Sequence, residues 1–143
     1  MNKQDVIDFL KQFELNQDII DNFFKNKHII TVNNNTFLTT KKFEKNQIYG
    51  GILLFIQLKE HLPSKFLLNF IKQNTKLVEI ISEKQALNFT YGKDLKIGQV
   101  KFQQFNNKQL YIVTYKNEIL GYAKYYEKEF NNLMNIGEYL KES

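Results

Sequence analysis

Short apolar runs, bounded by turn-forming residues, divide much of this 143-residue chain into strand-sized pieces. Residues 28–32 and 36–40 are β-rich and flank three asparagines, a pattern that predicts a hairpin. A polar loop or short helix is expected at 41–46. After a glycine pair, residues 52–59 predict a buried strand, because isoleucine, leucine and phenylalanine dominate them. This apolar run is far shorter than the roughly 20 residues of a membrane-spanning helix, so we expect a soluble, intracellular protein.

Three segments of the first half repeat their apolar residues at helical spacing. One runs from Val6 to Phe13 and another covers residues 19–24. The third follows Pro63, which suits the first turn of a helix. Together with the strands, these helices predict that residues 1–75 form an α+β domain, sandwich-like, with an antiparallel sheet. The apolar face of the third helix is predicted to contain Phe66, Leu67, Phe70 and Ile71.

The second half is richer in predicted strands. Two asparagines near position 106 predict the turn of a second hairpin, and Gly121 is expected to break the strand that contains it. Several short strands with frequent turn signals predict that residues 76–143 form a small β-barrel-like domain. The predicted strands are 77–81, 98–105, 108–116 and 119–126, with a helix-compatible segment at 83–88.

The charge of the chain favours acidic partners. The net charge is +5, arginine is absent, and lysines concentrate between residues 23 and 116, while both ends carry more acids than lysines. A basic middle region favours a polyanion such as nucleic acid. The alternative is a solvated lysine surface without a partner, as expected for a composition that is also rich in asparagine.

No motif in the sequence argues for catalysis, metal binding or cofactor binding; Glu138 and Glu142 could pair as acid and base, but two exposed carboxylates on a terminal helix are the preferred interpretation. Cysteine is absent, which excludes disulfides, thiolate zinc sites and cysteine nucleophiles. Gly92-Lys93 is not a phosphate loop, because Leu87 replaces the required glycine and Asp94 the Ser or Thr. The two histidines, His28 and His61, lie far apart. We therefore expect no enzyme activity, no metal and no cofactor.

One segment, Phe89 to Val100, combines features of a phosphate-binding turn. Gly92 allows a positive φ angle and a tight turn, and Lys93 and Lys96 flank it. Backbone amides around such a turn, with ammonium groups beside them, predict a place for phosphate oxygens. Gly98 is expected to let the next strand begin at an unusual angle. The competing interpretation is a plain glycine turn between a helix and a strand.

The same segment resembles the signature of PUA domains, which are small β-barrel RNA-binding modules. Two further motifs, Leu120-Gly121-Tyr122 and the ending Ile136 to Lys141, are similar to sequences of the Nip-seven family of large-ribosomal-subunit biogenesis factors. The family layout is an α+β domain followed by a C-terminal PUA domain, which matches the order and length of this chain.

The resemblance implies a non-catalytic RNA-binding factor in pre-rRNA processing and large-subunit assembly. Its partners would be single-stranded regions of pre-rRNA and ribosome-assembly proteins, and it would act as a monomer, in the cytoplasm of an archaeon or the nucleolus of a eukaryote. Gly92 would shape the turn, and Tyr91 or Tyr125 would stack on an unpaired base. The lysines expected to contact phosphates are Lys93, Lys96, Lys124 and Lys128.

Two other functions fit the sequence. The chain could be a protein-interaction adaptor, in which an acidic N-terminal surface containing Asp5, Asp8, Asp18 and Asp21 binds a partner. It could also be a PUA-containing accessory subunit of an RNA-modifying enzyme.

Overall fold

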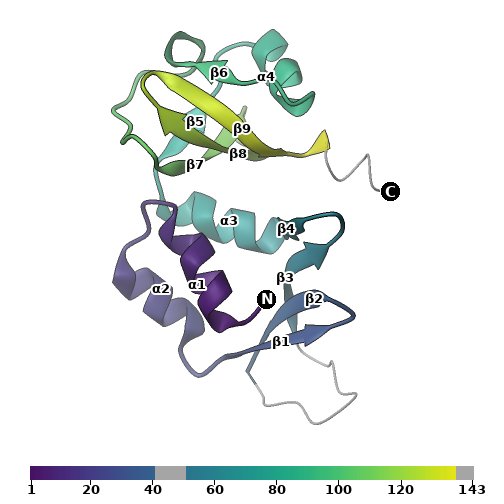
Figure 1. Ribbon diagram of the computed structural model, residues 1–143. Helices are drawn as coiled ribbons and strands as arrows, with labels where there is room; N and C mark the ends of the chain where they lie inside the picture. The colour runs from purple at the N-terminus through teal and green to yellow at the C-terminus, as the bar shows by residue number, and fades with distance from the viewer. Residues whose placement is uncertain (41–50, 138–143) are drawn as a thin grey trace. The chain divides into compact units, whose positions relative to one another are not determined.

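A computed structural model describes residues 1–40 and 51–137 of the chain (Figure 1). The fold is mixed α+β, as predicted, and divides into two compact units. The first unit contains residues 1–11 and 15–74, and the second contains residues 12–14 and 75–143. The predicted loop at 41–46 and the terminal motif from Glu138 onward lie outside the described residues.

The first unit combines helices with an antiparallel sheet, which confirms that part of the prediction. The sheet order is β1-β2-β3-β4, and every neighbouring pair is antiparallel. The core includes buried side chains from α1, α2, α3 and the sheet. In chain order the elements are α1 (Lys3–Lys11), α2 (Gln17–Phe24), β1 (His28–Val32), β2 (Asn35–Thr39), β3 (Ile52–Gln57), β4 (His61–Pro63) and α3 (Lys65–Asn74).

The predicted hairpin of the first unit is confirmed as β1–β2. Asn33 and Asn34 form its two-residue turn with φ angles of 51° and 67°. Positive φ at both turn residues matches the right-handed twist of the strands, and asparagine tolerates this conformation better than other non-glycine residues.

Two predictions in the first unit are wrong in detail. Pro63 does not begin a helix: it ends edge strand β4 opposite Phe55, where the missing N–H is tolerated. Helix α3 is capped instead by Ser64, whose hydroxyl accepts a 3.2 Å hydrogen bond from the Leu67 amide. Phe66, expected on the buried face of α3, is 44% exposed, and Leu68 is buried in addition to the predicted Leu67 and Ile71.

The second unit is built on a five-stranded sheet in the order β5-β7-β8-β9-β6. Strand β5 is parallel to β7, and the other neighbours are antiparallel. Strand β7 is buried on both faces, which explains its continuous apolar sequence. Its elements are β5 (Leu77–Glu79), α4 (Glu83–Thr90), β6 (Leu95–Lys96), a 3₁₀ turn (Ile97–Gln99), β7 (Leu110–Tyr115), β8 (Glu118–Tyr126) and β9 (Glu129–Asn135).

The predicted hairpin around residue 106 is wrong. Strand β7 pairs with β8 instead, through a turn at Lys116 and Asn117 with φ angles of 47° and 68°. Residues 98–105 form no regular strand: the segment begins in the 3₁₀ turn, which bonds to the turn between β8 and β9, and it then bonds to edge strand β5. The Ile97 amide donates to the Lys128 carbonyl at 2.8 Å, and the Lys101 amide donates to the Glu79 carbonyl at 2.8 Å.

Gly121 does not break its strand, contrary to expectation. It lies inside β8 with a φ angle of 151°, next to β9, and a Cβ atom there would overlap the carbonyl group of Met134. Glycine is therefore required by the close approach of the two strands. Gly98 is also not the start of a strand: it lies in the 3₁₀ turn and faces open space.

A short segment from between the first two helices belongs to the second unit. Phe13, predicted on the face of the first helix, lies outside α1 and forms a parallel bridge with Leu110. The Tyr111 hydroxyl donates to the Glu14 carboxylate at 2.6 Å and accepts from the Asn106 amide at 2.8 Å. Burial raises the pKa of Tyr111, the Asn106 bond opposes that rise, and Glu14 adds to it. The hydroxyl therefore stays protonated as a donor.

Candidate nucleic-acid interface

The turn at Gly92 is the C-terminal cap of α4. Gly92 has a φ angle of 94°, and its amide donates to the Phe89 carbonyl at 3.0 Å. The Lys93 amide donates to the Asn88 carbonyl, also at 3.0 Å. These bonds satisfy the last carbonyls of the helix. Those amides, which were expected to hold phosphate oxygens, are therefore already used within the turn, and a helix C-terminus also repels anions.

Asn132 of β9 holds this turn against the sheet. Its side-chain amide donates to the Phe89 carbonyl at 2.7 Å and to the Lys93 carbonyl at 3.1 Å. Its backbone amide donates to the Asp94 carboxylate at 2.8 Å. The buried Asn135 side chain donates to the Asn132 amide oxygen at 3.2 Å. The backbone of Lys93 is thereby fixed beside β9, and its side chain remains exposed.

The other predicted lysines meet around the far end of the β8–β9 hairpin. Lys96 of β6 pairs in register with Glu129 of β9, which also pairs with Tyr126 of β8. Lys124 lies two residues before Tyr126, so both side chains are on one face of β8. Lys128 is in the hairpin turn itself, where its carbonyl accepts from the adjoining 3₁₀ turn.

A fourth lysine, Lys108, lies beside Lys96, Lys124 and Lys128, and the sequence did not predict it as a binding residue. Its amide donates to the Tyr125 carbonyl at 2.7 Å, which places it beside the same hairpin end. The sequence placed Lys108 at the start of a predicted strand, and nothing in the sequence indicated its hydrogen bond to Tyr125. We call Lys96, Lys108, Lys124 and Lys128 the hairpin-tip lysines. All four are exposed.

The hairpin-tip lysines keep their charge available. Within the described residues, the only ion pair shorter than 4.0 Å joins Lys101 to Glu79, at 3.2 Å. Glu127 and Glu129 lie at the same hairpin end but form no ion pair of that length with a lysine in the described part of the chain. The turn residues Glu127 and Lys128 have φ angles of 43° and 70°, a conformation that favours asparagine or glycine.

The two predicted stacking tyrosines differ in their surroundings. Tyr125 is partly buried against the core, with its ring 5.5 Å from that of Phe105 and 5.0 Å from that of Phe130. Tyr91 is 76% exposed and lines an open groove of about 600 Å³ beside α4. Tyr126, the neighbour of Tyr125, is exposed at the hairpin end. The structure thus places Tyr126, which the sequence did not single out, nearer the hairpin-tip lysines than Tyr91.

Phe102 is a further aromatic residue that the sequence did not single out. It is 91% exposed, on the segment that follows the 3₁₀ turn. No sequence pattern distinguishes it from a strand residue, because its exposure depends on how its neighbours bond to β5.

Within residues 1–40 and 51–137, no group of three or more His, Asp or Glu side chains is arranged to hold a metal ion. Over the same part of the chain, no helix has the length and apolar character needed to cross a membrane. The sequence matches no protein-family model, and no curated protein matches it at a significant level.

Proposed function

We propose that the chain is a non-catalytic RNA-binding protein whose second unit holds single-stranded RNA on the hairpin-tip lysines. The observation that carries this proposal is the convergence of four exposed lysines from three separate segments, none of them paired with a carboxylate of residues 1–40 or 51–137. Ammonium groups spaced along a sheet face suit the phosphates of a flexible strand. Tyr126, between Lys124 and Lys128, is the residue best placed to stack on a base.

The finer identity of the protein is also a proposal. The segment that leaves edge strand β6 through the 3₁₀ turn bonds to β5, the opposite edge strand of the five-stranded sheet, and this arrangement supports a PUA-type barrel. Together with the sequence motifs, it supports a role like that of the Nip-seven family, in pre-rRNA processing and large-subunit assembly. The protein would act as a monomer, in the archaeal cytoplasm or the eukaryotic nucleolus.

The proposal predicts a strong salt dependence. Binding of the full chain to fluorescein-labelled single-stranded RNA would be measured by anisotropy over a range of salt concentrations. Replacing Lys96, Lys124 and Lys128 with alanine removes three phosphate contacts, and should flatten the slope of log affinity against log salt by about 2. Affinity near 0.1 M salt should fall at least tenfold, since each contact is a charge-assisted interaction.

The matched control removes the same charge elsewhere. Lys25, Lys59 and Lys65 are exposed lysines of the first unit, and their triple alanine variant should bind within about twofold of the wild type. If both triple variants lost RNA affinity equally, net charge alone would explain the effect, and the proposed surface would be contradicted. A wild type with no affinity for single-stranded RNA would overturn the function itself.

The adaptor function has one observation in its favour. Asp5 and Asp8 of α1 and Asp18 and Asp21 of α2 are all exposed, so the first unit presents an acidic surface. Failure of RNA binding, together with a stable complex that requires these four carboxylates, would favour the adaptor.

A further inference from the structure

Phe102 is the most exposed large apolar side chain among the described residues, at 91%. The rest of its segment is well anchored. Val100 is buried and forms an antiparallel bridge with Ile80, and the Phe105 ring packs 5.1 Å from that of Phe130. An exposed ring between two anchored residues contributes almost nothing to the free energy of folding, because it buries almost no apolar surface.

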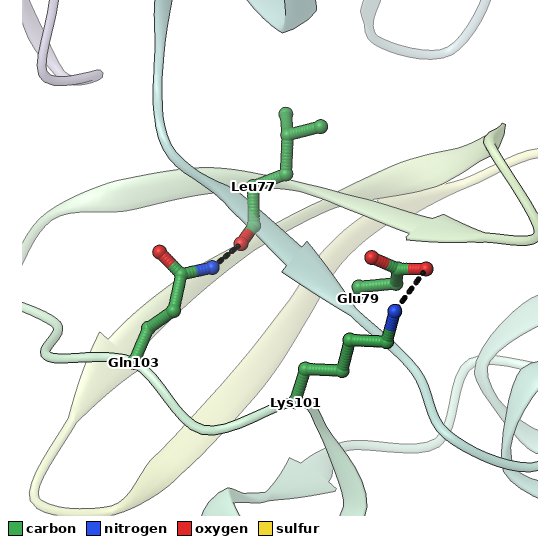
Figure 2. Close-up of polar contacts among 4 residues, drawn as sticks. All are labelled: Leu77, Glu79, Lys101 and Gln103. Atoms are coloured by element: carbon green, nitrogen blue, oxygen red, sulfur yellow. Dashed lines mark hydrogen bonds and ion pairs between the residues drawn. The ribbon is translucent and has the colours of Figure 1, made fainter.

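The contacts of the neighbouring side chains keep this segment in place. Figure 2 shows the Gln103 side chain donating to the Leu77 carbonyl, at 2.8 Å, and Lys101 paired with Glu79. The Lys76 ammonium donates to the Gln104 carbonyl at 2.6 Å. Residues on both sides of Phe102 therefore bond either to β5 or to Lys76, which precedes β5. The Phe102 ring itself remains exposed to solvent.

The surroundings of Phe102 indicate what kind of partner it meets. Its chain neighbours Lys101, Gln103 and Gln104 are polar, so the segment itself offers one isolated ring, far less than the roughly 800 Å² that each partner contributes to a protein interface. A nucleobase requires only one aromatic face. The Lys76 ammonium lies beside the same segment, where it donates to the Gln104 carbonyl, and its positive charge would attract a phosphate backbone.

We propose that Phe102 stacks on an unpaired base of the single-stranded RNA bound by the hairpin-tip lysines. This inference rests on the proposed function and extends the binding surface along the chain, since Phe102 follows Lys96 by one 3₁₀ turn and a short extended segment. It adds an aromatic contact at a position where the sequence indicated none.

The test uses the full chain and single-stranded RNA containing 2-aminopurine, whose fluorescence is quenched by stacking. Phe102→Ala should weaken binding about 5-fold to 150-fold and abolish quenching at one position of the RNA. Phe102→Trp should retain both, whereas Phe102→Leu, which is apolar but has no aromatic face, should behave like the alanine variant. The salt slope should not change, because no charge is removed.

Controls separate this inference from the proposed function. Leu133→Ala removes another exposed apolar side chain of the second unit and should leave RNA binding unchanged. If the wild type binds RNA and the lysine variants lose affinity, but Phe102→Ala binds like the wild type, stacking is wrong and the lysine surface stands. Full affinity of Phe102→Leu would also overturn stacking. A wild type that binds no single-stranded RNA overturns both proposals. Thermal unfolding of the Phe102 variants should match that of the wild type, since the ring is exposed.

Discussion

The turn after α4 and the tip of the β8–β9 hairpin differ in how they use their backbone. Both contain a lysine beside a residue with positive φ: Lys93 follows Gly92, and Lys128 itself has that conformation. At the first turn, the amides already donate to helix carbonyls. At the hairpin, strand pairing brings lysines from separate segments together. A glycine–lysine motif thus forms a helix cap, and sheet register assembles the cationic surface.

The largest expected effect is on the hairpin itself. Gly121→Ala should destabilise the protein by more than about 3 kcal/mol, or prevent folding, because the new Cβ would overlap the Met134 carbonyl at a φ angle that favours glycine. Urea denaturation measures the change. Gly98→Ala is the matched control, since a Cβ there meets open space, and its stability should change by about 0.5 kcal/mol or less. Equal stability of the two variants would show that the strands can separate at Gly121.

A smaller effect should separate stability from binding at the hairpin tip. Changing Glu127→Asn together with Lys128→Gly gives the turn its preferred residues, and should stabilise the protein by about 1 to 2 kcal/mol. RNA affinity should nevertheless fall severalfold, because a phosphate contact is lost. The same change at the β7–β8 turn, Lys116→Asn with Asn117→Gly, should leave RNA binding intact. If binding falls equally for both turns, the hairpin tip has no special role.

The smallest effect is expected at the helix cap. Gly92→Ala should cost about 1 kcal/mol, since alanine is strained at a φ angle of 94° but the site is open. RNA affinity should stay within about twofold of the wild type, because the amides of the turn are already bonded. A tenfold loss of RNA affinity in a folded variant would restore the turn as a binding element.

Much of the local structure was predictable because it depends on near neighbours. Helical periodicity located α1 and α2, and the asparagines at 33 and 34 located the first hairpin. The β8–β9 hairpin was missed because its turn is Glu127–Lys128, which carries no glycine or asparagine signal. Residues 98–105 were predicted as a strand from their composition, and the structure shows that tertiary hydrogen bonds determine their irregular path.

For the candidate site, the sequence predicted the residue types and several of the lysines, but not which residues lie together. Composition identified lysine as the only strongly basic residue, and local motifs selected Lys96, Lys124 and Lys128. Nothing local indicated that Lys108 joins them, or that the Tyr125 ring packs against the core while Tyr126 is exposed. Strand alternation alone allows either tyrosine to face the core.

By itself, the sequence determined the α+β composition, the basic character and most of the helices and turns, because these follow from neighbouring residues and from charge. Only the tertiary structure decided which lysines share a surface, why Gly121 lies inside a strand, and that Phe102 faces solvent. Each of these depends on pairing between segments distant in sequence, where a shift of one residue in register would move every side chain to the opposite face.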